Sequence, residues 1–188
     1  MKALYEFIVI PEGERYNNKK DVDGKELIVN TEITERDAGF VNRIAKVVAT
    51  PAAIDTPVQV GDLIVVHHNV FRTWYDQRGN LADGSGYLGE NTFAVSIDQV
   101  FAYKPADKWI SAPGFVFVAP TYSKEAEEKL LKRPVSEDPL KGLVRITNDS
   151  CGVDTGDVVG FTPESEYAFS IEGDNLYRIR ERDLTLVY

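Results

Sequence analysis

Apolar residues along the chain come in short runs, separated by polar, glycine-containing or proline-containing segments. Residues 7–11 (FIVIP) and 116–120 (VFVAP) are each an apolar run that ends at a proline, which cannot donate a hydrogen bond to a sheet. Residues 40–47 and 142–147 alternate apolar with polar side chains over part of their length, as half-buried strands do. The pattern predicts an all-β fold with about five short strands in each half of the chain.

The strongest match between the halves is a glycine–aspartate pair that precedes an apolar run. Gly61-Asp62 is followed by LIVV, and Gly156-Asp157 is followed by VVGF. Glycine gives the backbone the freedom that a tight turn needs, and aspartate can accept hydrogen bonds within its own turn. We expect both pairs to be structural turns of an internal repeat.

The spacing between matching positions shrinks along the chain. It falls from 109 residues at the prolines to 95 at the glycines and 85 at the closing tyrosines, Tyr103 and Tyr188. The first copy therefore has extra residues in two places, before its Gly-Asp pair and around residues 79–89. Both segments are polar or glycine-rich, and such segments accept insertions.

The repeat predicts two domains, at residues 1–105 and 106–188. The joining segment, residues 104–108, is too short for the domains to swing independently. Residues 123–132 predict a short helix in a long loop of the second domain. A serine cap and early acidic residues precede late lysines there, and Pro134 follows.

Charge and hydropathy exclude several classes of partner. The formal net charge is -9, and Lys and Arg form no cluster of the kind that binds nucleic-acid phosphates. The apolar runs are far shorter than the ~20 residues of a membrane-spanning helix. The first residues lack the long apolar region of a secretory signal. We therefore expect a cytoplasmic protein without nucleic-acid or membrane partners.

The sequence predicts neither catalysis nor a metal site. His67 and His68 are adjacent on an expected strand, where neighbouring side chains point to opposite faces and cannot chelate one metal together. Cys151 is the single cysteine and is expected as a small turn or core residue. The glycine-rich segment at residues 79–86 lacks the lysine of a phosphate-binding loop, which indicates a flexible hairpin tip. We expect no cofactor and no enzymatic activity.

Five aromatic residues crowd one part of the first half: Phe71, Trp74, Tyr75, Tyr87 and Phe93. Core filling is the favoured interpretation. The alternatives are a surface that contacts unfolded clients or another protein, and a module that binds carbohydrate or a small ligand. If Trp74 and Tyr75 lie on a regular strand, one of them faces outward.

The order of elements resembles the GroES-type co-chaperonin family. The matching parts of the first half are an opening strand, a long polar loop with an apolar tripeptide, a strand, a Val-Gly-Asp turn and a closing strand: residues 7–10, 12–38, 41–48, 60–62 and 98–102. The second half matches at residues 116–120, 156–157 and 183–188. Two copies in one chain are similar to the chloroplast co-chaperonins, and phage co-chaperonins show that strongly diverged members exist. The resemblance implies two tandem GroES-like small β-barrels.

In that family the long loop docks its apolar tripeptide onto a GroEL-type chaperonin. The matching tripeptide here is Leu27, Ile28 and Val29. The alternative is that the tripeptide is an ordinary strand after the turn-like Asp23-Gly24, with its side chains in the core. In the second loop Leu130 and Leu131 are weaker docking candidates, because core packing is favoured for leucines on a helix.

The resemblance implies a protein that engages a chaperonin ring and assists protein folding, with any nucleotide bound by the chaperonin. Family members build rings by pairing terminal strands, here residues 1–10 and 184–188. These edges can instead pair within one chain and leave a monomer. The alternative function is a structural or assembly protein, for example a phage component, that reuses the same fold for protein contacts.

Overall fold

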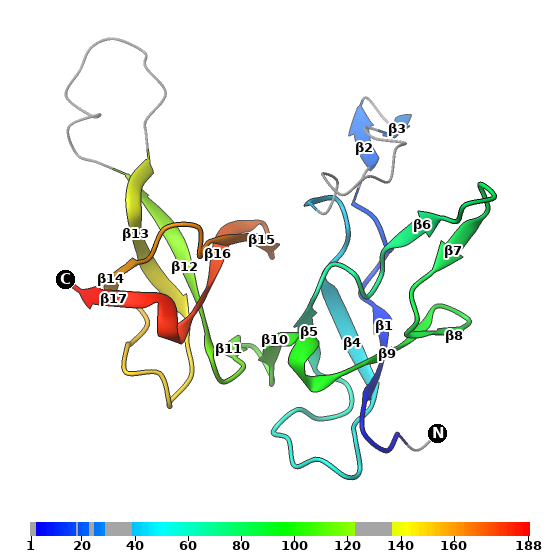
Figure 1. The fold of residues 1–188 in the computed structure, drawn as a ribbon, viewed down its shortest axis with the longest axis horizontal. Helices are drawn as coiled ribbons and strands as arrows, with labels where there is room; N and C mark the ends of the chain where they lie inside the picture. The colour runs from blue at the N-terminus through cyan, green and yellow to red at the C-terminus, as the bar shows by residue number, and fades with distance from the viewer. Residues whose placement is uncertain (1–2, 18, 23–24, 29–38, 123–136) are drawn as a thin grey trace. The chain divides into compact units, whose positions relative to one another are not determined.

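The computed structural model describes residues 3–17, 19–22, 25–28, 39–122 and 137–188. These residues form β-strands connected by turns and short 3-10 helices (Figure 1). The all-β class predicted from the sequence is confirmed. The expected helix at residues 123–132, with Leu130 and Leu131, lies outside the described residues.

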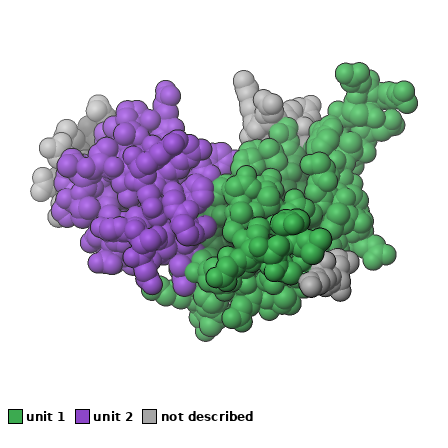
Figure 2. Space-filling model, turned by 60° about the horizontal axis from the view of Figure 1, so that its bottom comes forward, with its two compact units in different colours: residues 1–109 green, residues 110–188 purple. Residues whose placement is uncertain are grey.

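The chain divides into two compact units, Met1–Trp109 and Ile110–Tyr188, coloured green and purple in Figure 2. The repeat in the sequence predicts the division between residues 105 and 106, four residues earlier. Each unit has a hydrophobic core of its own.

The first unit contains one main sheet and two separate strand pairs. The strands of the main sheet are β1 (Phe7–Pro11), β4 (Ile44–Ala49), β5 (Leu63–Val66), β8 (Tyr87–Gly89), β9 (Thr92–Val95) and β10 (Val100–Lys104). They are hydrogen-bonded in the order β10-β5-β4-β1-β9-β8, and each neighbouring pair is antiparallel. The strand pairs are β2 (Lys19–Val22) with β3 (Lys25–Ile28), and β6 (Thr73–Tyr75) with β7 (Leu81–Asp83). A 3-10 helix, η2 (Ile97–Gln99), separates β9 from β10.

The second unit begins at the short strand β11 (Ile110–Ser111) and contains one six-stranded sheet. Its strands are β12 (Phe115–Tyr122), β13 (Glu137–Ile146), β14 (Val158–Phe161), β15 (Tyr167–Ile171), β16 (Asp174–Arg180) and β17 (Leu184–Val187). They lie in the order β17-β14-β13-β12-β16-β15 and are all antiparallel. The 3-10 helix η4 (Glu181–Asp183) separates β16 from β17.

The two sheets have the same strand order. Strands β1, β4, β5, β8, β9 and β10 correspond in turn to β12, β13, β14, β15, β16 and β17, both along the chain and across the sheet. The 3-10 helices also occupy equivalent places before the closing strands. The two units therefore share one topology.

The hydrogen-bond register extends this equivalence to single residues. In the first unit Val9 pairs with Val47 directly after a register shift that passes over one residue of β4, and in the second Val118 pairs with Val144 directly after a shift that passes over one residue of β13. Such a bulge bends a strand and increases its twist, so the bend falls at the same point of both sheets.

The closing strands correct the spacing that the sequence indicated. Tyr103 pairs with Ile64, and Val187 pairs with Val159, which is the equivalent position to Ile64. Tyr103 is therefore equivalent to Val187 and not to Tyr188, and the offset is 84 residues rather than 85.

The sheets are open, where the resemblance implied closed barrels. Among the described residues, β8 pairs only with β9, and β15 pairs only with β16. Strand β8 ends at Gly89, because Gly89, Glu90 and Asn91 have positive φ angles, of 97°, 48° and 58°, and turn the chain into β9.

Each core combines inward side chains of the sheet with residues of the connections between strands. In the first unit the rings of Phe71 and Phe93 meet edge to face at 4.9 Å between centroids, and both side chains are fully buried. In the second unit Cys151 is buried with Val144 and Ile179, which agrees with its expected place as a small core residue. Burial raises the pKa of the Cys151 thiol.

Long apolar helices are absent from the ranges described above: none could cross a membrane.

Candidate functional site

The two Gly-Asp turns are built from the same hydrogen bonds. The N–H of Gly61 donates to the carbonyl of Val47 at 2.9 Å, and the N–H of Gly156 donates to the carbonyl of Val144 at 2.9 Å. The φ angles of these glycines are +100° and +104°, which side chains other than glycine rarely allow. Gly61, Asp62, Gly156 and Asp157 thus lie in turns that lead into β5 and β14.

Residues 12–43 connect β1 to β4, and backbone hydrogen bonds join the two ends of this connection next to the sheet. Residues 12–17 run antiparallel to residues 40–44, and we call these two segments the stem. Three backbone hydrogen bonds join them, from Glu12 N to Ile44 O, from Asn42 N to Arg15 O and from Asn17 N to Phe40 O, at 2.9, 2.9 and 2.7 Å. The stem fixes where the connection leaves the sheet.

Asn42 holds the stem from inside. Its side chain is buried, and Nδ2 donates to the carbonyls of Glu12 at 2.7 Å and Glu14 at 2.9 Å. Its Oδ1 accepts a hydrogen bond from the N–H of Ile44 at 2.9 Å. One side chain therefore satisfies three backbone groups that the end of the sheet would leave unpaired.

Arg15 joins the stem to the β6–β7 hairpin. Its Nη1 lies 2.7 Å from Oδ1 of Asp83 on β7, and its Nε donates to the carbonyl of Phe71 at 3.0 Å. The guanidinium carbon also lies 4.9 Å from the ring centroid of Phe93, where a cation is attracted to the ring face. Tyr16 adds a second link, because its hydroxyl accepts a hydrogen bond from the N–H of Thr73 at 2.7 Å.

The predicted docking tripeptide lies partly on β3. Leu27 pairs with Lys20 and Ile28 pairs with Lys19 in the β2–β3 ladder, whereas Val29 lies outside the described residues. Strands β2 and β3 form a two-stranded sheet of their own and are not part of the main sheet. Leu27 and Ile28 are thus on a strand, as the alternative interpretation expected. That strand belongs to the segment beyond the stem, residues 18–39, which we call the excursion, and not to the main sheet.

The terminal strands β1 and β17 differ in whether one or both of their edges are hydrogen-bonded to a neighbouring strand. Ile8 and Val9 pair with strands on both sides, so this part of β1 has no free edge. Strand β17 pairs with β14 on one side only, as far as the described residues show. Its Leu186 and Val187 are exposed, and so is Tyr188, which follows the strand. Of the described parts of the expected ring-forming segments, residues 184–187 form a strand that is paired along one side only.

The histidine pair is placed differently from the prediction. Strand β5 ends at Val66, and the two histidines lie in the turn that follows rather than on the strand. The ring centroids of His67 and His68 are 4.2 Å apart, so the expectation that they point to opposite faces is wrong. The chain turns here because the N–H of Val70 donates to the carbonyl of His67 at 3.0 Å.

The electrostatics of this turn oppose a charged imidazole. Burial lowers the pKa of His68 to about 4, with further lowering from the positive charges of His67, Arg43 and Arg72. Within the described part of the chain no three His, Cys, Asp or Glu side chains gather to hold a metal ion.

The five aromatic residues separate into two groups. Phe71 and Phe93 are core residues, as the favoured interpretation expected. Trp74 and Tyr75 on β6 are both exposed, at 43% and 61%, because the β6–β7 hairpin extends away from the main sheet (Figure 1). Tyr87 is borderline exposed, and its ring lies 5.2 Å from that of Phe93.

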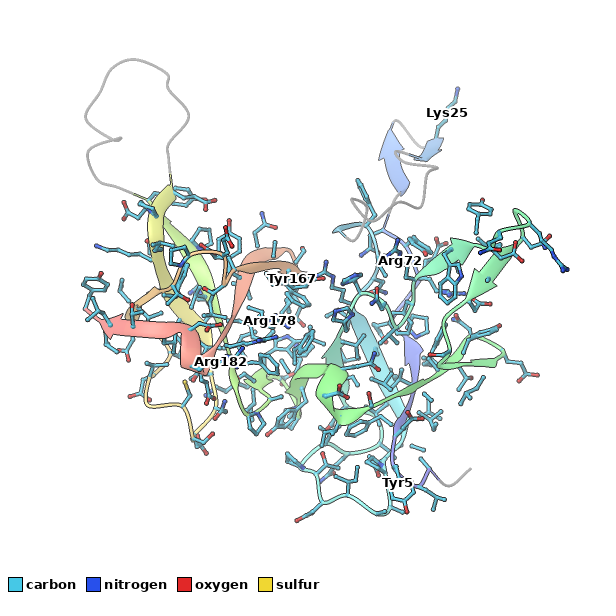
Figure 3. All side chains as sticks on the ribbon, in the orientation of Figure 1. Tyr5, Lys25, Arg72, Tyr167, Arg178 and Arg182 are labelled. Atoms are coloured by element: carbon cyan, nitrogen blue, oxygen red, sulfur yellow. The ribbon has the colours of Figure 1, made fainter. Side chains whose placement is uncertain are left out.

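A pocket of about 710 Å3 lies beside this hairpin, with Trp74, Leu88 and Arg72 among its lining residues. Arg72, labelled in Figure 3, is half-buried and directly precedes the hairpin. The sequence could indicate this pocket only through its aromatic residues, since the other lining residues come from four separate segments of the first unit.

Comparison of the chain with models of known protein families and with curated proteins finds no match.

Proposed function

We propose that the chain is a co-chaperonin-like protein of two GroES-like units, which binds a GroEL-type chaperonin ring through residues 18–39 and assists protein folding without a reaction of its own. The observation that carries the proposal is the excursion between β1 and β4. The stem holds its base, and Leu27 and Ile28 lie beyond the stem on a strand pair separate from the main sheet. This is where the co-chaperonin family has its docking loop.

The duplicated topology supports the same proposal. Two units with one strand order and one Gly-Asp turn fit a tandem member of that family. The two units differ in the length of the connection between their first two strands, which is longer in the first unit. We therefore assign the docking role to the first unit, at Leu27, Ile28 and Val29.

Docking through a short apolar segment suits a lid that must also be released. A few apolar side chains give a weak single contact, and several chains held together multiply the total affinity by raising the effective concentration of each segment. The free edge of β17 offers a way to hold chains together, since an unpaired strand edge can pair with another chain.

That same edge favours a second candidate function, a structural or assembly protein such as a phage component. Exposed Leu186 and Val187 on a strand with one unpaired edge, followed by exposed Tyr188, suit a permanent contact between protein subunits. In this case the chain would assemble through β17 and would not bind a chaperonin.

Capture on an immobilised GroEL-type ring, with ATP or ADP present, tests the proposal. We expect nucleotide-dependent capture of the intact chain, and its loss in Ile28→Asp, because a carboxylate cannot enter an apolar groove without a large desolvation cost. Val60→Asp is the matched control, since Val60 is 62% exposed and lies outside the excursion. It should be captured normally.

Two outcomes would reject chaperonin docking through the tripeptide. One is absence of capture in every nucleotide state, and the other is equal capture of Ile28→Asp and the unmodified chain. A large loss of thermal stability in Ile28→Asp would instead place Ile28 in a core, as the alternative interpretation of the tripeptide holds.

A further inference from the structure

The pocket beside the β6–β7 hairpin has the size of a ligand site. Its volume of about 710 Å3 falls within the roughly 300–1,000 Å3 of small-molecule pockets. All the described residues that line it belong to the first unit. None of the described residues of the excursion lines the pocket, and ligand binding there can be tested separately from chaperonin docking.

One wall of the pocket is apolar and exposed. Trp74 contributes a large flat ring and is 43% exposed, and Leu88 is 56% exposed. Burying such a ring under a ligand is favourable because apolar surface leaves water. The next residue on β6, Tyr75, is more exposed but does not line the pocket.

The other walls carry polar side chains with hydrogen-bond donors available to a ligand. Arg72 is half-buried and lines the pocket, yet it makes no hydrogen bond or ion pair with any residue that the structure describes. A half-buried guanidinium has five N–H donors, and leaving them without partners is costly unless water or a ligand accepts them. Arg72 is therefore a donor available to a ligand.

Gln99 is a second available donor with a fixed orientation. Its Oε1 accepts hydrogen bonds from Ser96, from N at 3.4 Å and from Oγ at 3.2 Å. This leaves the amide Nε2 to donate, and both residues line the pocket. Asn69 adds a further amide, and Glu6 adds a carboxylate that accepts hydrogen bonds. The pocket thus offers donors and acceptors together.

Two glycines keep part of the wall as bare backbone. A Cβ on Gly86 would lie 2.5 Å from the carbonyl oxygen of Ala94, so no larger residue fits there. The N–H of Ala94 donates to the carbonyl of Gly86 at 2.7 Å, and the N–H of Tyr87 donates to the carbonyl of Gly84 at 2.9 Å. The segment at residues 84–86 is thus a structured wall, and the hairpin tip lies at residues 76–80, where the N–H of Asp76 donates to Asn80 O.

From this combination we propose that the pocket binds a short neutral carbohydrate, with one sugar ring stacked on Trp74. A pyranose has an apolar face of C–H groups and a rim of hydroxyls, each of which both donates and accepts hydrogen bonds. The apolar face fits the indole ring, and the rim fits the amides of Asn69 and Gln99, the guanidinium of Arg72 and the carboxylate of Glu6.

The charge of the lining favours a neutral ligand over an anion. Arg72 is the single cationic side chain among the described lining residues, and the carboxylate of Glu6 has the opposite charge. A phosphate site usually gathers several cations or a row of backbone N–H groups. The pocket volume suits a ligand larger than one sugar ring, which makes a di- or trisaccharide the fitting size.

Ligand-observed saturation-transfer NMR on the full chain tests the proposal, with the probes maltotriose, cellotriose and the trimer of N-acetylglucosamine. At least one should bind saturably with a Kd of about 1 mM or tighter, as confirmed by calorimetry. Trp74→Ala should weaken that binding at least ~5-fold, because the stacking ring is lost. Arg72→Met, which keeps the length of the side chain but removes its donors, should also weaken it.

Tyr75→Ala is the matched control, because Tyr75 is an exposed aromatic residue on the same strand that does not line the pocket. Its binding should be unchanged. Thermal melting of each variant shows whether the fold is kept, and the exposure of Trp74 predicts that it is. Arg72→Met supplies an independent test if Trp74→Ala does not fold.

Three results would overturn the carbohydrate site. The first is no saturable binding of any of the three sugars up to about 10 mM, where even a weak millimolar site would be occupied. The second is equal loss in Tyr75→Ala and Trp74→Ala. The third is binding of inorganic phosphate or glucose 6-phosphate without binding of the neutral sugars, which would indicate an anion site.

Discussion

Asp62 and Asp157 make the same hydrogen bonds in the two units. The carboxylate Oδ2 of each accepts the N–H of the residue three positions earlier at 2.8 Å, from Gln59 and Asp154. The backbone carbonyl of each accepts the N–H of a valine on the preceding strand, at 2.9 Å for Val47 and 2.8 Å for Val144. Atom-level agreement at positions 95 residues apart shows that both halves of the chain use one device to enter the same strand of the sheet.

This equivalence predicts equal effects of substitution at the two turn glycines. Gly61→Ala and Gly156→Ala should each lower the free energy of unfolding by about 1–2 kcal/mol, because alanine is strained at φ angles of +100° and +104°. No atom lies within 4 Å of the added Cβ, so the cost comes from the backbone. Urea denaturation measures the loss.

Gly152→Ala is the control for the turn glycines. Gly152 also has open space around its Cβ position, but its φ lies outside the positive range. It should change the free energy of unfolding by less than about 0.5 kcal/mol. A loss as large as that of Gly156→Ala would show that backbone strain is not the cause.

The stem depends on one buried amide. Asn42→Ala should lower the free energy of unfolding of the first unit by about 3 kcal/mol, because the carbonyls of Glu12 and Glu14 and the N–H of Ile44 lose their partner. Thermal and urea unfolding check this loss. Asn80→Ala, in an exposed hairpin tip, should be nearly neutral, and an equal effect of the two changes would contradict the role of Asn42.

Arg15 and Asp83 should be energetically coupled. The double-mutant cycle of Arg15→Met and Asp83→Asn should give a coupling energy of about 1 kcal/mol, because both side chains are largely screened from water at an ion-pair distance of 2.7 Å. The single change Arg15→Met should also cost stability through its lost contact with Phe93. A coupling energy of zero would mean that the ion pair does not join the stem to the hairpin.

His68 should make stability depend on pH. Its pKa of about 4 in the folded chain lies below the value of 6.5 in the unfolded chain. The unfolded chain therefore binds a proton that the folded chain does not, and the free energy of unfolding falls as the pH is lowered from 6.5 to 4. Because His68 is partly exposed, we expect a loss of roughly 1 kcal/mol rather than the full linkage value.

The variant His68→Gln isolates this contribution. It should flatten the dependence of the unfolding free energy on pH between 6.5 and 4, when compared with the unmodified chain by urea denaturation. His67→Gln should keep most of the dependence, since burial of His68 is the largest cause of its lowered pKa. An unchanged slope in His68→Gln would show that another group titrates in this range.

The sequence predicted the parts of the fold that local chemistry determines. The glycine and aspartate of each turn, and the proline that follows each opening apolar run, mark strands that the structure contains. The offset at the closing strands was wrong by one residue, because matching Tyr103 to Tyr188 ignored the register that pairs Val187 with Val159. Register depends on the partner strand, which the sequence of one strand does not specify.

The parts of the candidate sites that join distant segments could not be predicted. Arg15 and Asp83 are separated by most of the first unit, and nothing in the residues around either one indicates the other. The histidine pair was expected on a strand because its neighbours are β-branched, but a turn begins after Val66. The sequence indicated only that aromatic residues cluster in this part of the chain. Of these, Trp74 lines the pocket, and Phe71 is not among its described lining residues.

Amide hydrogen exchange with and without an ATP-loaded GroEL-type ring tests chaperonin docking most directly. At a saturating concentration of the ring, we expect exchange to slow most strongly within residues 18–39, the segment beyond the stem. Exchange should be unchanged at residues 76–80, the tip of the β6–β7 hairpin. Identical exchange at residues 18–39 with and without the ring would contradict the proposed docking function.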